Sequence, residues 1–358
     1  MMSRLDELTT VALLEGFPMR HVMPALASAE SGFSTPRELL ADLARRTICM
    51  TMLAGSGSRW VSSIMEAKAA GHTTADPAAP RGLYGVANRM GIGPESIPIA
   101  AYALGAVRDL GRHVIVVRGW ERDIEDSILR PLSYPLGTWT FATQDAPGGK
   151  PRGHGDAAWQ TRALWSRAEY VIVNFGGDAS SPLTAFSSLA VLDALVSYLG
   201  DQAPGLLMPA AYVESPAYPI DIDEQGLPRH FGHAKLQGGS PLVSHGSSSG
   251  HGYTNVGVRV YRSKALLEAI EAIRDDHWSL QGGYDIPGNV SAGDDPHGGE
   301  FALDNVDAKM AEAGQARLLA VARPEELSPV KSLADLARFE DDIALVSEDW
   351  AVLRGLLE

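Results

Sequence analysis

The sequence predicts an α/β protein in three layers, with a mostly parallel central sheet covered by helices on both faces. Short apolar, β-branched runs recur along the first 210 residues, and segments with apolar side chains at helical spacing alternate with them. Such alternation is typical of crossover units, whose strands run parallel. The chain of 358 residues is 45% apolar, which is enough to bury a core of this kind.

The elements of the first half follow in a regular order. The first helix begins at Thr35, a good capping residue, and Pro36 suits its first turn. A buried strand comes next and ends at glycines. Helices are predicted over 35–46, 97–110, 156–168 and 183–199, and strands at 48–53, 113–117, 170–174 and 205–208.

The pattern becomes mixed beyond residue 208. Short strands are predicted at 211–213, 219–223, 227–231 and 255–261, a helix at 264–274, and loops at 238–252 and 282–299. The last 30 residues, from Ser332, are predicted helical and are rich in acidic residues. These patterns divide the chain into an N-terminal helical extension (1–45), a main α/β domain (46–345) and a C-terminal helical tail (346–358).

The charge balance disfavours general binding to polyanions. Asp and Glu number 44 against 30 Lys and Arg, a formal charge of -14, which argues against nucleic acid and anionic membranes as partners. The single cysteine, Cys49, cannot form an intramolecular disulfide. No apolar run approaches the roughly 20 residues of a membrane span, and residues 1–14 lack the pattern of a signal peptide. We therefore expect a cytoplasmic protein, and the oligomeric state, including a homo-oligomer, stays open.

A glycine-rich turn, Gly55-Ser56-Gly57-Ser58-Arg59, follows the first predicted strand. Glycines let backbone N–H groups approach an anion, while the hydroxyl and the guanidinium add a donor and a fixed charge. The turn lacks the lysine of the P-loop and the third glycine of the dinucleotide fingerprint, which disfavours a dinucleotide-dependent oxidoreductase. It predicts a phosphate-binding turn, with a plain strand connection as the alternative.

Three motifs in order carry a family resemblance. The turn at 55–59, followed by Pro80-Arg81-Gly82-Leu83, resembles the signature of the sugar-1-phosphate nucleotidyltransferases. Gly153-His154-Gly155-Asp156 and Pro329-Val330-Lys331-Ser332 are similar to segments of the UDP-sugar pyrophosphorylases, which include the UTP–glucose-1-phosphate and UDP-N-acetylhexosamine enzymes. The resemblance spans roughly residues 48–340. It implies a Rossmann-like, GT-A-like nucleotidyltransferase fold and a Mg²⁺-dependent transferase that joins a nucleoside triphosphate, preferably UTP, to a sugar 1-phosphate and releases pyrophosphate.

The same resemblance implies roles for individual residues. Asp178, in Asn174-Phe175-Gly176-Gly177-Asp178, is the implied magnesium ligand, and a carboxylate is the ligand type that Mg²⁺ prefers. A turn or helix-capping aspartate is its structural alternative. The residues implied to bind phosphate during catalysis are Arg59, Arg81 and Lys331. Those implied to bind the nucleotide are Gly55, Gly57, Ser58, Gln144, Gly153 and His154, and those implied to bind the sugar are Asn255, Lys235 and Glu300.

One departure from the family pattern concerns phosphate binding. Arg81 stands where the family has lysine, and residues 60–79 form a longer gap than in close relatives. A guanidinium still bridges phosphate oxygens, and Lys68 is the other candidate cation. The departure leaves two alternatives open: a transferase of the same fold with a non-sugar phosphate acceptor, and a non-catalytic nucleotide- or sugar-binding protein. The histidines of the second half lack the compact spacing of a zinc site.

Overall fold

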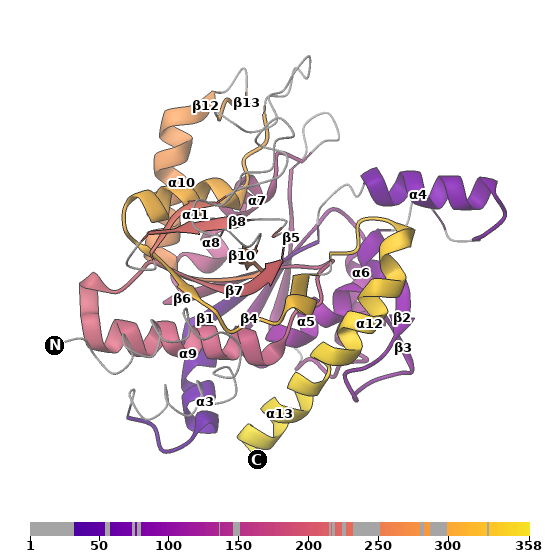
Figure 1. The fold of residues 1–358 in the computed structure, drawn as a ribbon, viewed down its shortest axis with the longest axis horizontal. Coiled ribbons are helices and arrows are strands. Elements are labelled where there is room, and N and C mark those ends of the chain that lie inside the picture. Colours follow the sequence, from indigo (N-terminus) through magenta and orange to yellow (C-terminus); the bar gives the residue numbers. More distant parts are fainter. Residues whose placement is uncertain are drawn as a thin grey trace.

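The structure, a computed structural model, describes residues 32–53, 58–73, 76, 80–135, 137–145, 151–214, 216, 219–223, 227–231, 251–279, 283–286, 299–327 and 329–358. It is an α/β fold with a large mixed central sheet and helices around it (Figure 1). The predicted α/β class is therefore confirmed, and the sheet has the expected parallel core.

Four parallel strands form that core, in the order β5-β4-β1-β6. Their bounds are β1 Thr47–Met52, β4 Arg112–Val117, β5 Trp139–Thr143 and β6 Tyr170–Phe175. The strand β1 has β4 on one side and β6 on the other, and the chain adds β4 and β5 on the first side before β6 on the second, so the strand order reverses beside β1. In open α/β sheets, ligands bind in the crevice that forms at the carboxyl ends of the strands at such a point.

The sheet continues beyond β6 as a mixed extension. Strand β11 (Val258–Arg262) lies antiparallel between β6 and β7 (Leu206–Glu214), and β14 (Ala316–Leu319) pairs parallel with β7. Antiparallel strands complete the order β7-β10-β8-β9. Their bounds are β8 Pro219–Ile222, β9 Pro228–Phe231 and β10 His251–Asn255.

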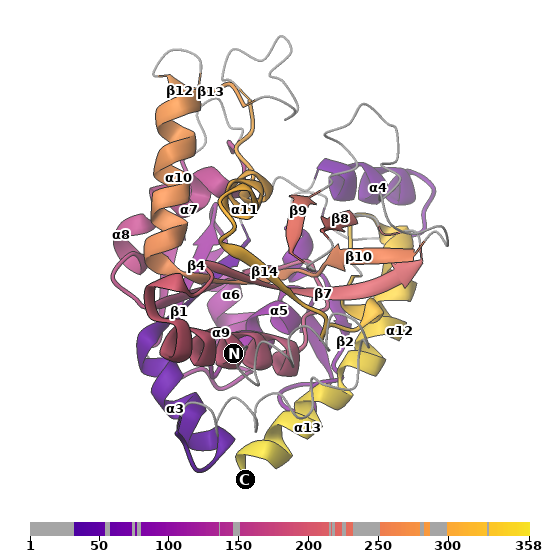
Figure 2. The same ribbon diagram turned by 60° about the vertical axis from the view of Figure 1, so that its left-hand side comes forward.

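Helices cover both faces of the sheet, as three layers require. One face packs against α3 (Pro36–Arg46), α5 (Ala100–Val107) and α9 (Pro182–Leu199). The other packs against α7, α8, α10 and α11, and Figures 1 and 2 show this second group on the side of the sheet opposite α9. Their bounds are α7 His154–Gln160, α8 Arg162–Trp165, α10 Ser263–His277 and α11 Leu303–Glu312.

The helix α9 is the centre of its layer. By length and composition it is the one candidate for a membrane span among the described residues, although Ser, Thr and Asp interrupt its apolar run. In its most apolar window 72% of the residues are buried, so it is packed mostly within the core of the fold. The last helix, α13 (Glu348–Leu357), packs against both α9 and α3, and α12 (Leu336–Val346) precedes it.

Most predicted elements lie within a few residues of their observed bounds. Thr35 caps α3 as expected, because its Oγ1 accepts a hydrogen bond from the Glu38 N–H at 3.2 Å. The predicted helix 156–168 divides at Thr161, whose hydroxyl donates to the Ala157 carbonyl at 2.9 Å. The predicted strand 255–261 is divided by the turn between β10 and β11, while 205–208 and 211–213 form one strand, β7. The helix predicted at 97–110 is shorter, because β3 (Ser96–Pro98) precedes it.

Several elements were not predicted from the sequence. They are α4 (Ser58–Ala69), α6 (Glu121–Ile124), β2 (Gly85–Ala87), the two-residue strands β12 (Trp278–Ser279) and β13 (Gly283–Tyr284), β5, α11 and β14. The predicted loops 238–252 and 282–299 lie mostly outside the described residues.

A buried polar chain joins the sheet to α5 near the carboxyl ends of the strands. The Thr51 hydroxyl donates to the Asn174 amide oxygen at 2.7 Å, and the Asn174 amide donates to the Ala103 carbonyl at 2.6 Å. All three residues are fully buried. Because each polar group has a partner, this chain fixes β1, β6 and α5 relative to one another.

Candidate functional site

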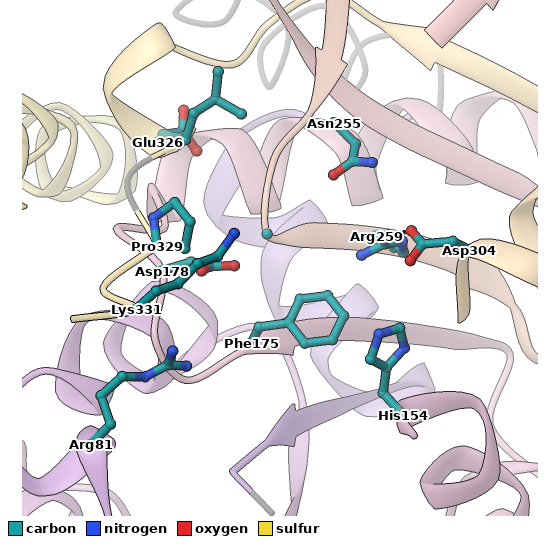
Figure 3. Close-up of a pocket in the computed structure, with 12 residues that line it drawn as sticks. Arg81, His154, Phe175, Asp178, Asn255, Arg259, Asp304, Glu326, Pro329 and Lys331 are labelled. Carbon is teal, nitrogen blue, oxygen red and sulfur yellow. Dashed lines mark hydrogen bonds and ion pairs between the residues drawn. The ribbon is translucent and has the colours of Figure 1, made fainter. Parts of the chain in front are cut away.

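A cavity of about 220 Å³ lies near the carboxyl end of β6, on the side of the sheet covered by α7 and α11. Its lining residues come from segments far apart in the sequence (Figure 3). They are Arg81, His154, Phe175, Asp178, Asn255, Gly257, Arg259, Asp304, Glu326, Leu327, Pro329 and Lys331. Five of the predicted site residues are among them: Arg81, His154, Asp178, Asn255 and Lys331.

Asp178 reaches the cavity from the loop after β6, and Arg81 reaches it from a separate segment. Arg81 begins a short 3-10 helix, Arg81–Leu83, and its guanidinium lies directly over Gly177, where an added Cβ would stand 2.2 Å from a guanidinium nitrogen. On the other side, a Cβ on Gly257 would stand 2.1 Å from an oxygen of Asp178. A side chain at Gly177 would displace the Arg81 guanidinium, and one at Gly257 would displace the Asp178 carboxylate.

The carboxylate of Asp178 is partly buried and faces positive charge. Desolvation raises the pKa of Asp178 to about 6, and the charges of Arg81, Lys331 and Arg259 oppose that rise. Figure 3 shows Asp178 beside Lys331 on one side of the cavity, with Arg259 and Asp304 on the other. A carboxylate among cations is therefore the main electrostatic feature of this site.

The segment that carries Lys331 is attached to the Asp178 loop. The Val330 N–H donates to the Gly177 carbonyl at 3.0 Å. The Lys331 N–H donates to the Asp335 carboxylate at 2.9 Å, and the Ser332 N–H and hydroxyl donate to it at 2.8 and 3.0 Å. Because hydrogen bonds hold the backbone of Val330, Lys331 and Ser332, the Lys331 side chain starts from a fixed position at the cavity wall.

His154 enters the cavity from the first turn of α7. Its Nδ1 accepts a hydrogen bond from the Leu303 N–H at 2.7 Å, so the neutral ring carries its hydrogen on Nε2. The ring meets Phe175 edge-on, with centroids 5.1 Å apart. Gly153 has a φ of 91°, and a Cβ there would stand 2.4 Å from the Phe301 carbonyl oxygen, so the backbone before His154 also requires glycine.

Gln144 and Glu300 flank this segment without lining the cavity. The Gln144 amide donates to the Gly153 carbonyl at 2.8 Å and is buried. Glu300 is exposed, and its Cγ lies 2.7 Å from the position of a Cβ on Gly153. Gln144 therefore holds the Gly153 backbone, and Glu300 lies close beside it.

The motif residue Asp156 points into a different cluster. Its carboxylate accepts hydrogen bonds from Gln160 at 2.6 Å and from the Tyr284 hydroxyl at 2.9 Å, and Arg274 lies 3.7 Å away. Arg274 stands over the rings of Trp159 and Trp278, 4.3 and 4.7 Å from their centroids. This cluster joins α7 to α10 and holds the backbone of the 153–156 segment in place.

Arg259, which forms one wall of the cavity, was not predicted from the sequence. The residue is 3% exposed, and its guanidinium donates to Asp307 at 2.7 Å and to Asp304 at 2.6 Å, while the Tyr261 hydroxyl donates to Asp307 at 2.5 Å. Arg259 also lies over the ring of Phe175, 5.1 Å from its centroid. Its signal in the sequence is a charged residue between Val258 and Val260 in an otherwise apolar strand.

The buried carboxylate of Glu326 also lines the cavity and was not predicted. It accepts hydrogen bonds from the Ser181 N–H at 3.2 Å, the Thr184 hydroxyl at 2.7 Å and the Arg323 N–H at 2.9 Å. Burial raises the pKa of Glu326 to about 7, and the nearby Asp349 adds to the rise. These bonds fix the segment before Lys331 to the start of α9, close to the Asp178 loop.

The remaining predicted residues are not placed at the cavity. Gly55, Gly57 and Lys235 lie outside the described residues, and only the backbone of Ser58 and Arg59 is described, as the first residues of α4. Lys68 is exposed in the last turn of α4 and does not line the cavity, whereas Arg81 does. Arg81 is therefore the better candidate for the cation after the first motif.

The residue that would hold a magnesium ion here is Asp178, which lines the cavity. Within the described part of the chain, no three His, Cys, Asp or Glu side chains form a group able to hold a metal ion. Asp178 offers a single carboxylate. Mg²⁺ in phosphate-transferring sites is commonly bound through one or two carboxylates together with substrate phosphates and water, which this arrangement permits.

No protein-family model matches this sequence, and a search of curated proteins finds no significant similarity.

Proposed function

We propose that this chain is a nucleotidyltransferase that joins a nucleoside triphosphate, preferably UTP, to a sugar 1-phosphate. One observation carries the proposal: a single cavity gathers Arg81, His154, Asp178, Asn255 and Lys331, which were selected from separate sequence motifs. The mixed sheet with its parallel core is compatible with the Rossmann-like, GT-A-like fold that those motifs imply.

In the proposed reaction, an oxygen of the sugar phosphate forms a bond to the α-phosphorus of the triphosphate. The bond from that phosphorus to the bridging oxygen breaks, and pyrophosphate leaves with the electron pair. The attacking oxygen is already anionic, so no side chain has to remove a proton. Catalysis of this kind depends on aligning two polyanions and neutralising their charge.

The cavity residues suit that task. Arg81 and Lys331 supply positive charge to the phosphates, and a guanidinium binds two oxygens at once. Asp178 would hold Mg²⁺, which neutralises phosphate charge when bound. The Nε2–H of His154 is a hydrogen-bond donor for the base, and the Asn255 amide both donates to and accepts from sugar hydroxyls. A protein with an overall charge of -14 needs such a local group of cations to bind a triphosphate.

The test is pyrophosphate release from each of the four common nucleoside triphosphates with a panel of hexose 1-phosphates and Mg²⁺. We expect Lys331→Ala to lower kcat/KM by about 100-fold, because removal of one group that stabilises developing charge has an effect of that order. Lys264→Ala is the matched control, since Lys264 lies on α10 with its side chain 85% exposed. Equal activity of the two variants would contradict the assignment of Lys331.

Asp178→Asn tests the metal assignment with almost no change in shape. We expect the variant to lose Mg²⁺-dependent turnover while its far-UV circular dichroism stays the same. Calorimetry that detects UTP binding without turnover for any sugar phosphate would instead support a nucleotide-binding protein. Turnover with a non-sugar phosphate alone would support a transferase with another acceptor. The expected cytoplasmic location belongs to this proposal.

A further inference from the structure

Three aromatic side chains lie together on the antiparallel extension of the sheet. Tyr253 of β10 pairs with Tyr212 of β7, and His251 pairs with Glu214 beside them. The Tyr212 ring centroid is 5.1 Å from that of Tyr253 and 6.0 Å from that of His251, and the Tyr212 and His251 planes differ by only 22°. We call Tyr212, Tyr253 and His251 the aromatic platform.

The register connects this platform to the cavity. Side chains alternate along a strand, so His251 and Tyr253 project from the same face as Asn255, which lines the cavity. The alternate residues agree with this, because Ala211 is buried in a cluster on the opposite face. Tyr253 lies two residues from Asn255, or about 7 Å, and His251 lies four residues away, or about 13 Å. The platform therefore extends outward from the sugar-facing wall of the cavity.

The geometry favours a flat, weakly polar ligand. Tyr212 is 51% exposed, although a tyrosine ring gains free energy when its faces are covered. The Tyr253 ring is tilted by 60° from the Tyr212 ring, so the nearly parallel Tyr212 and His251 rings provide the stacking surface. A pyranose ring has an apolar C–H face that stacks on aromatic rings, and its hydroxyls can bond to the tyrosine hydroxyls and the imidazole at the rim.

We propose that the aromatic platform is a second saccharide subsite and that the acceptor is a glycosyl phosphate with at least two sugar rings. This inference rests on the proposed function. Asp178 lies against Gly257, just beyond the end of β10. Moving away from Asp178, Asn255 is the last residue of β10 and Tyr253 lies two residues before it on that strand. That order matches phosphate, first ring and second ring in a disaccharide 1-phosphate, and the 7 Å step to Tyr253 is longer than one pyranose ring.

The kinetic test compares glucose 1-phosphate with the 1-phosphates of maltose, cellobiose and lactose, using the full chain and UTP. We expect a disaccharide 1-phosphate to be preferred, and Tyr212→Ala to lower the disaccharide-to-hexose ratio of kcat/KM about tenfold, equivalent to about 1.4 kcal/mol. Tyr212→Phe should keep the ratio because it keeps the stacking face. Tyr198→Ala is the matched control, since Tyr198 is 58% exposed on α9. A preference for the hexose, with a ratio unaffected by Tyr212→Ala, would overturn the inference.

A second measurement separates this inference from the proposed function. Maltotriose, cellotriose and lactose are titrated calorimetrically into the same variants without nucleotide. Saccharide binding that Tyr212→Ala abolishes, in a protein with no nucleotidyl transfer, would support the platform and overturn the proposed function. Transfer to hexose 1-phosphate without saccharide binding would do the reverse. A dimer that Tyr212→Ala converts to a monomer in sedimentation would make the platform an interface between copies and overturn the subsite.

Discussion

Replacement of Arg259 by methionine tests the wall of the cavity most directly. Methionine fills much of the space of the arginine side chain but removes its charge and its donors. The guanidinium is the cation bonded to Asp307, which is 0% exposed, and to Asp304, whose side chain is 13% exposed. In the variant, Asp307 keeps the Tyr261 hydroxyl as a donor but loses the adjacent positive charge.

The expected cost of Arg259→Met follows from that geometry. Removing one member of a buried ion pair leaves an uncompensated buried charge, which costs about 3–5 kcal/mol. The total stability of a domain is about 5–15 kcal/mol, so the effect is a large part of it. The loss should depend on pH. Burial already raises the pKa of Asp307 to about 6, and loss of the guanidinium raises the pKa of Asp307 further.

The sign of the pH dependence is determined by that rise. A carboxyl whose pKa is higher in the folded than in the unfolded protein binds its proton more tightly when folded, so its contribution to stability falls as pH rises through the folded value. We therefore expect the destabilisation by Arg259→Met to be largest at pH 8 and to decrease toward pH 4.

The assay is urea denaturation followed by circular dichroism, at several pH values. Arg262→Met is the control on the same strand, because Arg262 is only partly buried and its guanidinium donates to the Ala203 carbonyl at 3.1 Å without a carboxylate partner at hydrogen-bond distance among the described contacts. A cost below about 1 kcal/mol for Arg259→Met, equal to that of the control and independent of pH, would refute the reasoning.

Three further changes test neighbouring features. Gly177→Ala places a methyl group 2.2 Å from a nitrogen of Arg81, so we expect the KM for UTP to rise about tenfold in steady-state kinetics. Gly257→Ala displaces the Asp178 carboxylate, and we expect it to lower the free energy of unfolding by about 1–3 kcal/mol in urea denaturation and to weaken the Mg²⁺ dependence of turnover. Burial raises the pKa of Glu326 to about 7, so wild-type stability should fall by up to about 3 kcal/mol between pH 4.5 and 7, and Glu326→Gln should flatten that slope. An unchanged KM for UTP would contradict the Gly177→Ala prediction, and an unchanged Mg²⁺ dependence would contradict the Gly257→Ala prediction. A pH slope that Glu326→Gln leaves unchanged would contradict the third.

Local patterns in the sequence predicted the parallel core well. Each strand of β1, β4 and β6 is a short apolar run, buried on both faces, and such runs stand out without knowledge of their partners. The capping of α3 by Thr35 was predictable for the same reason, because the signal lies within four residues.

The rest of the fold depends on contacts between distant residues. Nothing local indicates that β11 inserts antiparallel between β6 and β7, since its apolar pattern fits either direction. The predicted helix 156–168 divides at Thr161, whose hydroxyl bonds to the preceding turn, and apolar periodicity does not indicate that division.

The candidate site, like the fold, was predicted only in part from the sequence. Motif order selected Arg81, Asp178 and Lys331, and the fold brings them to one cavity. Arg259 and Glu326 were missed because their importance comes from partners 45 or more residues away, Asp304 for the first and Thr184 for the second. The periodicity of a segment reports which face a residue occupies, but it does not report which charge it meets there.

The packing of α13 on α3 and α9 has a consequence for biosynthesis. The buried leucines of α3, Leu39 and Leu43, share one apolar cluster with α9 and with Leu353 of α13. During translation, α3 leaves the ribosome before α9 and α13, and that cluster is incomplete until residue 353 has emerged. Until then the apolar face of α3 lacks the partners that cover it in the folded chain.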